Sequence, residues 1–253
     1  MLVVIEENHS VDQMRANMPF LASISDRYGY ATHWHALAHP SEPNYLAITG
    51  GSTFGVTNDA LPAVNAPHVG DAQSVFSQAG SAGRSAATYV ESMPAPCAAV
   101  DSYPYVARHN PWTYFTADSK ACHDHDLGTA SFADDARRNE LPNVGLLIPN
   151  LLHDGHDESL EAADAWLQAE LTPVLASSDF SSGELVIVVT ADEDDRHSGN
   201  TVLTSVISTR LSHVVVDTTL THYALTRFID EVLRVEPLGA AGTAPEMAAA
   251  FGF

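Results

Sequence analysis

Four apolar runs rich in β-branched residues constrain the fold of this chain more than any other feature. They cover residues 2–5, 144–148, 185–189 and 202–207. Helical patterns lie between and after them, at residues 160–175 and 221–235, where apolar side chains recur at helical spacing. Continuously apolar strands that alternate with helices are typical of a parallel sheet buried on both faces. The pattern therefore predicts an α/β fold, a three-layer sandwich with a mostly parallel central sheet.

The length and composition favour a single domain. The chain has 253 residues, and 45% of them are hydrophobic, which is enough for one large core. The stretch from about 50 to 130 is richer in Gly, Pro, Ser and Ala, so we expect long loops with a few short helices there. No apolar run approaches the roughly 18 residues that a membrane span needs. We therefore expect one domain over residues 1–253, with a loop-rich insertion at about 50–130 and no integral membrane contact.

The charge of the chain narrows the class of partner. Its formal net charge is −21, from 11 Lys and Arg residues against 32 Asp and Glu residues. Such a surface repels nucleic acid and anionic membranes over a Debye length of about 8–10 Å, so we do not expect nucleic-acid binding. An anionic phosphate ester would be repelled as well. Phosphate chemistry here would require a local cation, and a bound metal ion is the natural one.

Two cysteines, Cys97 and Cys122, bear on the compartment. They are either two free buried thiols or one disulfide, and we favour the disulfide, which would contribute roughly 3–4 kcal/mol in the chain-entropy model. A disulfide would indicate an oxidising compartment. Neither cysteine lies in a CxxC pair, which argues against a zinc knuckle. The first residues lack a basic region and a cleavage site, so we read no signal peptide in this chain.

Polar side chains follow three of the predicted strands. Glu7, Asn8 and His9 come after the first strand, Asp154, Gly155 and His156 come shortly after the second, and Asp192, Glu193, Asp194 and Asp195 come after the third. In a parallel α/β sheet, ligands bind beyond the carboxyl ends of the strands. Carboxylates gathered there repel one another unless a cation neutralises them. Acidic loops can also simply decorate an acidic protein, but three of them at strand ends favour a metal site.

Three further segments carry candidate functional groups. Ser41 stands between Pro40 and Pro43, and a serine nucleophile needs a rigid, exposed hydroxyl. Arg108 beside His109 is a pair suited to bind phosphate and donate a proton.

A third group is His222, which begins the final predicted helix, where a histidine is well placed to face an anion. The alternatives are a Pro-rich turn around Ser41 and ordinary structural histidines. The absence of GxSxG, GxxxxGK[ST] and GxGxxG motifs disfavours a serine esterase of the α/β-hydrolase type and nucleotide-dependent chemistry.

Together these segments resemble the bacterial phosphoesterase family that groups acid phosphatases with phospholipases C, within the alkaline phosphatase superfamily. The matching stretches are Glu7-Asn8-His9-Ser10, His39-Pro40-Ser41-Glu42-Pro43-Asn44-Tyr45, Arg108-His109-Asn110-Pro111, Pro149-Asn150 with Asp154-Gly155-His156-Asp157, Thr190 with Asp192-Glu193, and His222-Tyr223. They occur in the family's order and span nearly the whole chain. The resemblance implies an alkaline-phosphatase-like fold and the hydrolysis of phosphoric esters.

The resemblance also implies residue roles. The metal ligands would be Glu7, Asn8, Ser41, Asp192 and Glu193, with Ser41 as the nucleophile; His109, His156 and His222 would contact phosphate or the leaving group, and Asn44, Arg108 and Asp154 would bind substrate. The family's cysteine pair corresponds to Cys97 and Cys122, which supports the disulfide. One departure is that Asp194 and Asp195 stand where the family often has Gly, and this extra charge could bind a second cation or tighten the first.

The sequence therefore predicts a metal-dependent phosphomonoesterase of the acid phosphatase type, secreted or in the cell envelope. Ser41 would form a phosphoseryl intermediate, and His109 or His156 would protonate the leaving oxygen. Oxygen-rich ligands favour Mg²⁺, Ca²⁺ or Mn²⁺, and the histidines leave Zn²⁺ open. The substrate would be small and phosphorylated, such as a phosphoinositide, a sugar phosphate or a nucleotide monophosphate. The alternatives are a phospholipase C-type phosphodiesterase and a catalytically silent metal-binding protein of the same fold.

Overall fold

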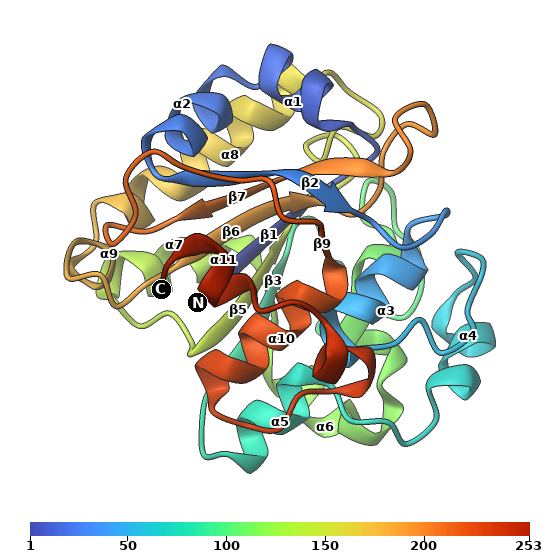
Figure 1. The fold of residues 1–253 in the computed structure, drawn as a ribbon. Helices are drawn as coiled ribbons and strands as arrows, with labels where there is room; N and C mark the ends of the chain where they lie inside the picture. Colours follow the sequence, from blue (N-terminus) through green and yellow to red (C-terminus); the bar gives the residue numbers. More distant parts are fainter.

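A nine-stranded sheet forms the centre of the computed structural model, which describes residues 1–253 (Figure 1). The strands are β1 (Leu2–Glu6), β2 (Gly29–His35), β3 (Ala86–Val90), β4 (Asp126–Gly128), β5 (Val144–Ile148), β6 (Ile187–Ala191), β7 (Thr201–Ile207), β8 (Val214–Val216) and β9 (Leu220–Thr221). Their order is β4-β3-β5-β1-β6-β7-β2-β8, and β9 also pairs with β2. Every pairing is parallel except those of β7 with β6 and β2. The expected α/β class with a mostly parallel sheet is confirmed.

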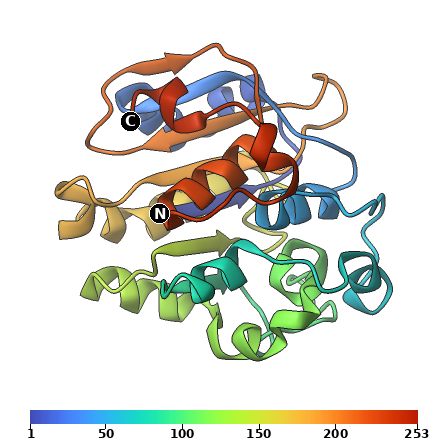
Figure 2. The ribbon, with the colours of Figure 1, turned by 60° about the horizontal axis from the view of Figure 1, so that its bottom comes forward.

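Helices cover both faces of this sheet (Figures 1 and 2). They are α1 (Val11–Asn17), α2 (Pro19–Arg27), α3 (Glu42–Gly50), α4 (Pro62–Val69), α5 (Val75–Ser81), α6 (Ser119–His125), α7 (Thr129–Arg138), α8 (Leu160–Leu175), α9 (Ser178–Ser181), α10 (His222–Leu233) and α11 (Met247–Phe251). Helices α1, α2 and α8 pack together on one face, and α3, α5 and α10 pack together on the other. None of the helices has both the length and the apolar composition that crossing a membrane requires.

The local sequence explains the central elements. Strands β1, β5 and β6 are buried along their whole length, which is why they are continuously apolar instead of alternating. Helix α1 begins at Ser10, whose side chain accepts from the main-chain N–H of Gln13 in a capping box. Gly51 follows the last residue of helix α3 as its C-cap, where φ is +66° and an added Cβ would lie 2.2 Å from the carbonyl oxygen of Leu238. Only glycine fits that position.

The structure differs from the sequence-based expectation at two places. The stretch from about 50 to 130 was expected to hold loops and short helices, but it also contributes β3 and β4 to the sheet. Strand β3 reads Ala-Ala-Thr-Tyr-Val, whose small and polar residues keep it from standing out as an apolar run. Strand β2 is equally inconspicuous, because its residues alternate between buried and half-exposed positions.

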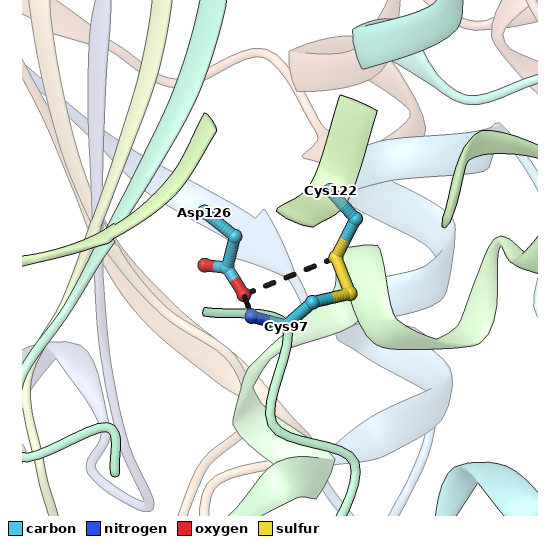
Figure 3. Close-up of side chains that lie close together, drawn as sticks. All are labelled: Cys97, Cys122 and Asp126. Carbon is cyan, nitrogen blue, oxygen red and sulfur yellow. Dashed lines mark hydrogen bonds between the residues drawn. A yellow bond between two sulfur atoms is a disulfide. The ribbon is translucent and has the colours of Figure 1, made fainter. Parts of the chain in front are cut away.

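The expected disulfide joins Cys97 to Cys122 and lies next to the buried side chain of Asp126 (Figure 3). Asp126 lies beside it and accepts hydrogen bonds from the main-chain N–H of Cys97 at 3.0 Å and from Asn110 Nδ2 at 2.8 Å. Burial raises the pKa of Asp126 to about 6. Because Asn110 directly follows Arg108 and His109, these contacts fix the segment that carries two of the predicted site residues.

Candidate active site

A polar cavity of about 210 Å³ lies among the segments that follow β1 and β6. None of its lining residues is hydrophobic. Those predicted from the sequence are Glu7, Asn8, Ser41, Arg108, His156 and Glu193. Two larger grooves, of about 470 and 460 Å³, lie elsewhere and contain none of the predicted residues. The smaller cavity is therefore where the segments singled out in the sequence meet.

Ser41 occupies the N-cap position of α3, but its side chain caps nothing. Serine is common at this position because its oxygen usually accepts from a main-chain N–H of the first turn. Here Ser41 Oγ instead donates a hydrogen bond to Glu7 Oε1 at 2.8 Å. Pro43 in the first turn needs no partner for a main-chain N–H and fixes the backbone there. The hydroxyl is thus held in place and directed toward the carboxylate cluster.

Three buried groups form the centre of that cluster. Glu7, His109 and Asp192 present ligand atoms that all lie within 4.8 Å of one another. Burial raises the pKa of Asp192 well above its usual value, and the charges of Glu7 and Glu193 raise it further. Asp192 Oδ2 has no hydrogen-bond partner. Buried carboxylates that repel each other and leave an oxygen free have the donor chemistry of a divalent-cation site.

His109 carries a positive charge between two carboxylates. Its Nε2 lies 2.9 Å from Glu7 Oε2, its Nδ1 lies 3.5 Å from Asp154 Oδ2, and its ring stacks on Tyr45. Burial would lower the pKa of His109, but the negative charges of Glu7 and Asp154 raise it to about 10. Burial would likewise raise the pKa of Glu7, but His109 brings it down to about 2. His109 does not line the cavity, so it acts on the site by holding Glu7 charged and in position.

His156 and Arg108 reach the same cavity from other directions. His156 follows β5 and is partly exposed, with Nε2 3.9 Å from Glu7 Oε1 and Nδ1 2.7 Å from Asp157 Oδ1. Arg108 belongs to the short helix Ala107–His109, and its Nε lies 3.8 Å from Asp59 Oδ2. The cavity therefore holds a hydroxyl, carboxylates, an imidazole and a guanidinium in one polar space.

Two residues expected to bind substrate lie behind the cavity. Asn44 uses its side-chain oxygen to accept from the main-chain N–H groups of Leu37 and Ala38, and its Nδ2 donates to the carbonyl of Ala38. Asp154 accepts from the main-chain N–H of His156 at 2.8 Å and faces His109 with its other oxygen. Neither lines the cavity. Both side chains are engaged in contacts with neighbouring loop residues.

His222 also lies behind the cavity, contrary to the expectation that it would face an anion. Its Nε2 is 2.7 Å from the carbonyl oxygen of Asp192, and its Nδ1 accepts from Trp34 Nε1 at 3.2 Å. Burial lowers the pKa of His222 to about 4. A neutral ring with both nitrogens engaged has no group left for a phosphate. His222 instead holds the main chain that carries Asp192.

Sequence reasoning missed Arg196, which lines the cavity from the loop between β6 and β7. The only signal was its place directly after the acidic run at the end of β6. The extra charge of Asp194 and Asp195 was expected to bind a second cation or tighten the first. In the structure the Asp194 carboxylate accepts from the main-chain N–H groups of Arg196, Ser198 and Asn200, so its oxygens are occupied in building the loop. The Asp195 carboxylate accepts from Gln13 Nε2 and from the main-chain N–H of His197.

Comparison with known sequences points to one family. The sequence pattern described as "Phosphoesterase family" matches residues 14–236. A phosphatidylinositol-3-phosphatase of Mycobacterium tuberculosis is 30% identical over 99% of this chain and 82% of its own. A phosphate-repressible acid phosphatase of Penicillium chrysogenum is 31% identical over 77% of this chain and 49% of its own. An acid phosphatase of Aspergillus fumigatus is 31% identical over 83% of this chain, which spans 48% of that relative.

Solved structures share the fold at low sequence identity. A lipoteichoic acid synthase of Listeria monocytogenes has a TM-score of 0.67 and 10% identity, over 99% of this chain and 76% of its own. A protein of the alkaline phosphatase superfamily from Vibrio parahaemolyticus has a TM-score of 0.63 and 11% identity, over 92% of this chain and 66% of its own. These likenesses establish an alkaline-phosphatase-like architecture.

Proposed function

The chain belongs to the phosphoesterase family and is a phosphoric ester hydrolase, and from this premise we propose that it is a metal-dependent phosphomonoesterase with Ser41 as its nucleophile. The observation that carries the proposal is the hydrogen bond from Ser41 Oγ to Glu7 Oε1, 2.8 Å long, beside a cavity with no hydrophobic lining residue. A serine held by a buried carboxylate in such a cavity is suited to attack an anionic ester when a cation is nearby.

The side chains present fit a divalent cation. Glu7, Asn8, Ser41, Asp192 and Glu193 would hold it, and the unpartnered Oδ2 of buried Asp192 supports this assignment. The oxygen donors favour Mg²⁺, Ca²⁺ or Mn²⁺, and His156 in the lining of the cavity leaves Zn²⁺ open. Such a cation would polarise the phosphoryl oxygens and lower the pKa of the serine hydroxyl.

The remaining steps follow from the chain's own side chains. Glu7 orients Ser41 Oγ, which releases its proton to solvent, attacks phosphorus in line and expels the alcohol oxygen. Water then hydrolyses the phosphoseryl intermediate, which releases phosphate and restores the Ser41 hydroxyl. His156 donates the proton to the leaving oxygen, because it is the histidine that lines the cavity. Arg108 binds a phosphoryl oxygen. His109, Asn44, Asp154 and His222 position these groups without touching substrate.

The substrate in this proposal is a small phosphomonoester. The cavity volume of about 210 Å³ suits a phosphoryl group with part of its leaving group, and a phosphoinositide headgroup, as for the mycobacterial relative, is one candidate. The chain spans about half the length of the fungal acid phosphatases that it matches. The Cys97–Cys122 disulfide is typical of an oxidising compartment, which supports a secreted or cell-envelope location.

The decisive experiment measures hydrolysis of p-nitrophenyl phosphate by the wild type, Ser41→Ala and Ser81→Ala. Ser81 is an exposed serine at the end of α5, so its variant is a matched control. We expect Ser41→Ala to lose at least about 10³-fold in kcat, since removing a nucleophile typically costs several orders of magnitude. Ser81→Ala should be unaffected. Near wild-type turnover by Ser41→Ala would refute the nucleophile.

The same assay tests the metal and the ester class. Exhaustive chelation should abolish turnover, and added Mg²⁺, Ca²⁺, Mn²⁺ or Zn²⁺ should restore it; activity that survives chelation would refute the metal requirement. A kcat/KM higher on bis-p-nitrophenyl phosphate than on the monoester would replace the proposal by a phospholipase C-type phosphodiesterase. Calorimetric metal binding with no hydrolysis of either ester would replace it by a silent metal-binding protein.

A further inference from the structure

The loop of residues 194–200, between β6 and β7, is ordered by one buried carboxylate. Asp194 Oδ1 accepts from the main-chain N–H of Arg196 at 2.7 Å, and Oδ2 accepts from those of Ser198 at 2.7 Å and Asn200 at 2.9 Å. The main-chain N–H of Asp194 donates in return to Asn200 Oδ1 at 2.9 Å. A carboxylate that binds several main-chain donors fixes the local backbone with strong, charge-assisted hydrogen bonds.

This loop is also joined to the segment that leads into Ser41. Asn200 Nδ2 donates to the carbonyl of Ala38 at 3.0 Å, and the main-chain N–H of Ala36 donates to the carbonyl of Asn200 at 2.9 Å. His39 Nε2 lies 3.2 Å from Asp194 Oδ1. The two segments therefore form one hydrogen-bonded unit, and the position of the loop is set relative to the nucleophile.

Arg196 is the residue that this unit presents to the cavity. Its backbone is left-handed, with φ of +69°, a conformation that the hydrogen bond to Asp194 stabilises. It lines the same cavity as Ser41, is exposed and forms no ion pair. The other guanidinium there, that of Arg108, lies near Asp59. Arg196 therefore brings to the acidic cavity a second guanidinium group, which is not engaged in an ion pair.

We propose that Arg196 is a specificity-determining residue that binds the second negative charge of a dianionic phosphomonoester. This inference rests on the proposed function. Near neutral pH a phosphate monoester carries about −1.5 to −2 charges, whereas a diester carries one. Arg108 and Arg196 together supply two guanidinium groups, which match the dianion and exceed what the diester needs. Asp194 acts through Arg196 as a positioning residue.

The test compares Arg196→Gln and Arg196→Lys with Arg210→Gln, an exposed arginine without an ion pair that follows β7 at the opposite edge of the sheet. Steady-state kinetics at pH 7 are measured on p-nitrophenyl phosphate and on bis-p-nitrophenyl phosphate. We expect Arg196→Gln to lower kcat/KM on the monoester by about 10- to 100-fold, as for loss of a charge-assisted hydrogen bond, and on the diester by less than about 3-fold. Arg196→Lys should recover part of the loss, and Arg210→Gln should change neither.

An unchanged kcat/KM on the monoester, or equal losses on both esters, would overturn the inference. Ser41→Ala measured in parallel distinguishes a failure of the proposed function from a failure of this inference. If Ser41→Ala is impaired and Arg196→Gln is not, only the inference about Arg196 is wrong. Calorimetric titration with inorganic phosphate provides a readout that does not depend on turnover. If the wild type hydrolyses neither ester, the proposed function fails, and the titration still decides the role of Arg196. Weaker phosphate binding by Arg196→Gln than by Arg210→Gln supports it, and equal affinities overturn it.

Discussion

Two buried histidines lie behind the cavity, and they differ in charge. His109 lies between the carboxylates of Glu7 and Asp154, which raise its pKa to about 10 although burial acts in the opposite direction. His222 lies between a main-chain carbonyl and the Trp34 indole, and burial lowers its pKa to about 4. The two rings are similarly buried, 2% and 0% exposed. Their partners, not their burial, therefore decide the charge.

Because they differ in charge, the two histidines stabilise the site in different ways. The His109 imidazolium neutralises Glu7, the carboxylate that accepts the Ser41 hydrogen bond. The His222 imidazole carries no charge and satisfies the carbonyl of Asp192, so it fixes the backbone without altering the charge of the carboxylates. Of the two rings, only His109 therefore adds positive charge beside the buried carboxylates.

The largest expected effect comes from replacing each histidine by glutamine, which is neutral and of similar reach. His109→Gln leaves Glu7 and Asp154 without their cation and should cost about 3–5 kcal/mol, as for one partner of a buried ion pair. His222→Gln keeps a donor for the Asp192 carbonyl and should cost about 1–3 kcal/mol, as for an imperfectly replaced hydrogen bond. Urea unfolding of the metal-free protein measures both.

The same unfolding measurements with added Mn²⁺ extend this comparison. In the proposed metal site, a cation at Glu7 would replace the positive charge that His109→Gln removes. It should therefore stabilise His109→Gln more than His222→Gln. Equal costs for the two substitutions without metal, or the same metal response in both, would show that the difference in charge has no consequence.

The sequence predicted the position of the carboxylates better than the surroundings of the two histidines. Glu7, Asp192 and Glu193 follow apolar strands, and the rule that parallel strands deliver their ends to one edge places them together. His109 and His222 were grouped because each belongs to a family-like motif. Their partners come from distant segments, Glu7 for one and Trp34 for the other, and no local pattern encodes which partner each ring meets.

The missed features have the same origin. Arg196 reaches the cavity because Asp194 binds three main-chain N–H groups of its loop. The acidic residues after β6 give no indication of this loop conformation. Asn44 was expected to bind substrate, but the main chain of residues 37–38 uses its amide. Strand β3 pairs with β5 along its whole length, and this pairing is not visible in its own residues. Side-chain partners and strand pairing across the chain are tertiary outcomes, which a motif does not specify.

The next effect is a pH dependence that distinguishes His222 from His109. Its pKa is about 4 in the folded protein and about 6.5 in the unfolded chain, so between these values the unfolded state binds more protons. Its contribution to stability is therefore complete above about pH 6.5 and falls as the pH drops toward 4, by up to about 3 kcal/mol. Urea unfolding of the wild type and of His222→Gln is measured at pH 7.5, 5.5 and 4. The difference between their unfolding free energies should shrink as the pH falls. A constant difference would mean that His222 is not held neutral.

The smallest expected effect concerns the second carboxylate of His109. Asp154→Asn keeps an oxygen for the main-chain N–H of His156 but removes the charge that lies 3.5 Å from His109 Nδ1. Because Glu7, at 2.9 Å, is the stronger partner, the pKa of His109 should fall but stay above that of an isolated histidine. The change in folding free energy should be within about 1 kcal/mol, the range of one long hydrogen bond. An NMR titration of the imidazole protons measures the pKa directly. An unchanged pKa of His109 would show that Glu7 alone raises it. A pKa that falls to the ordinary value of a histidine would make Asp154 the dominant partner.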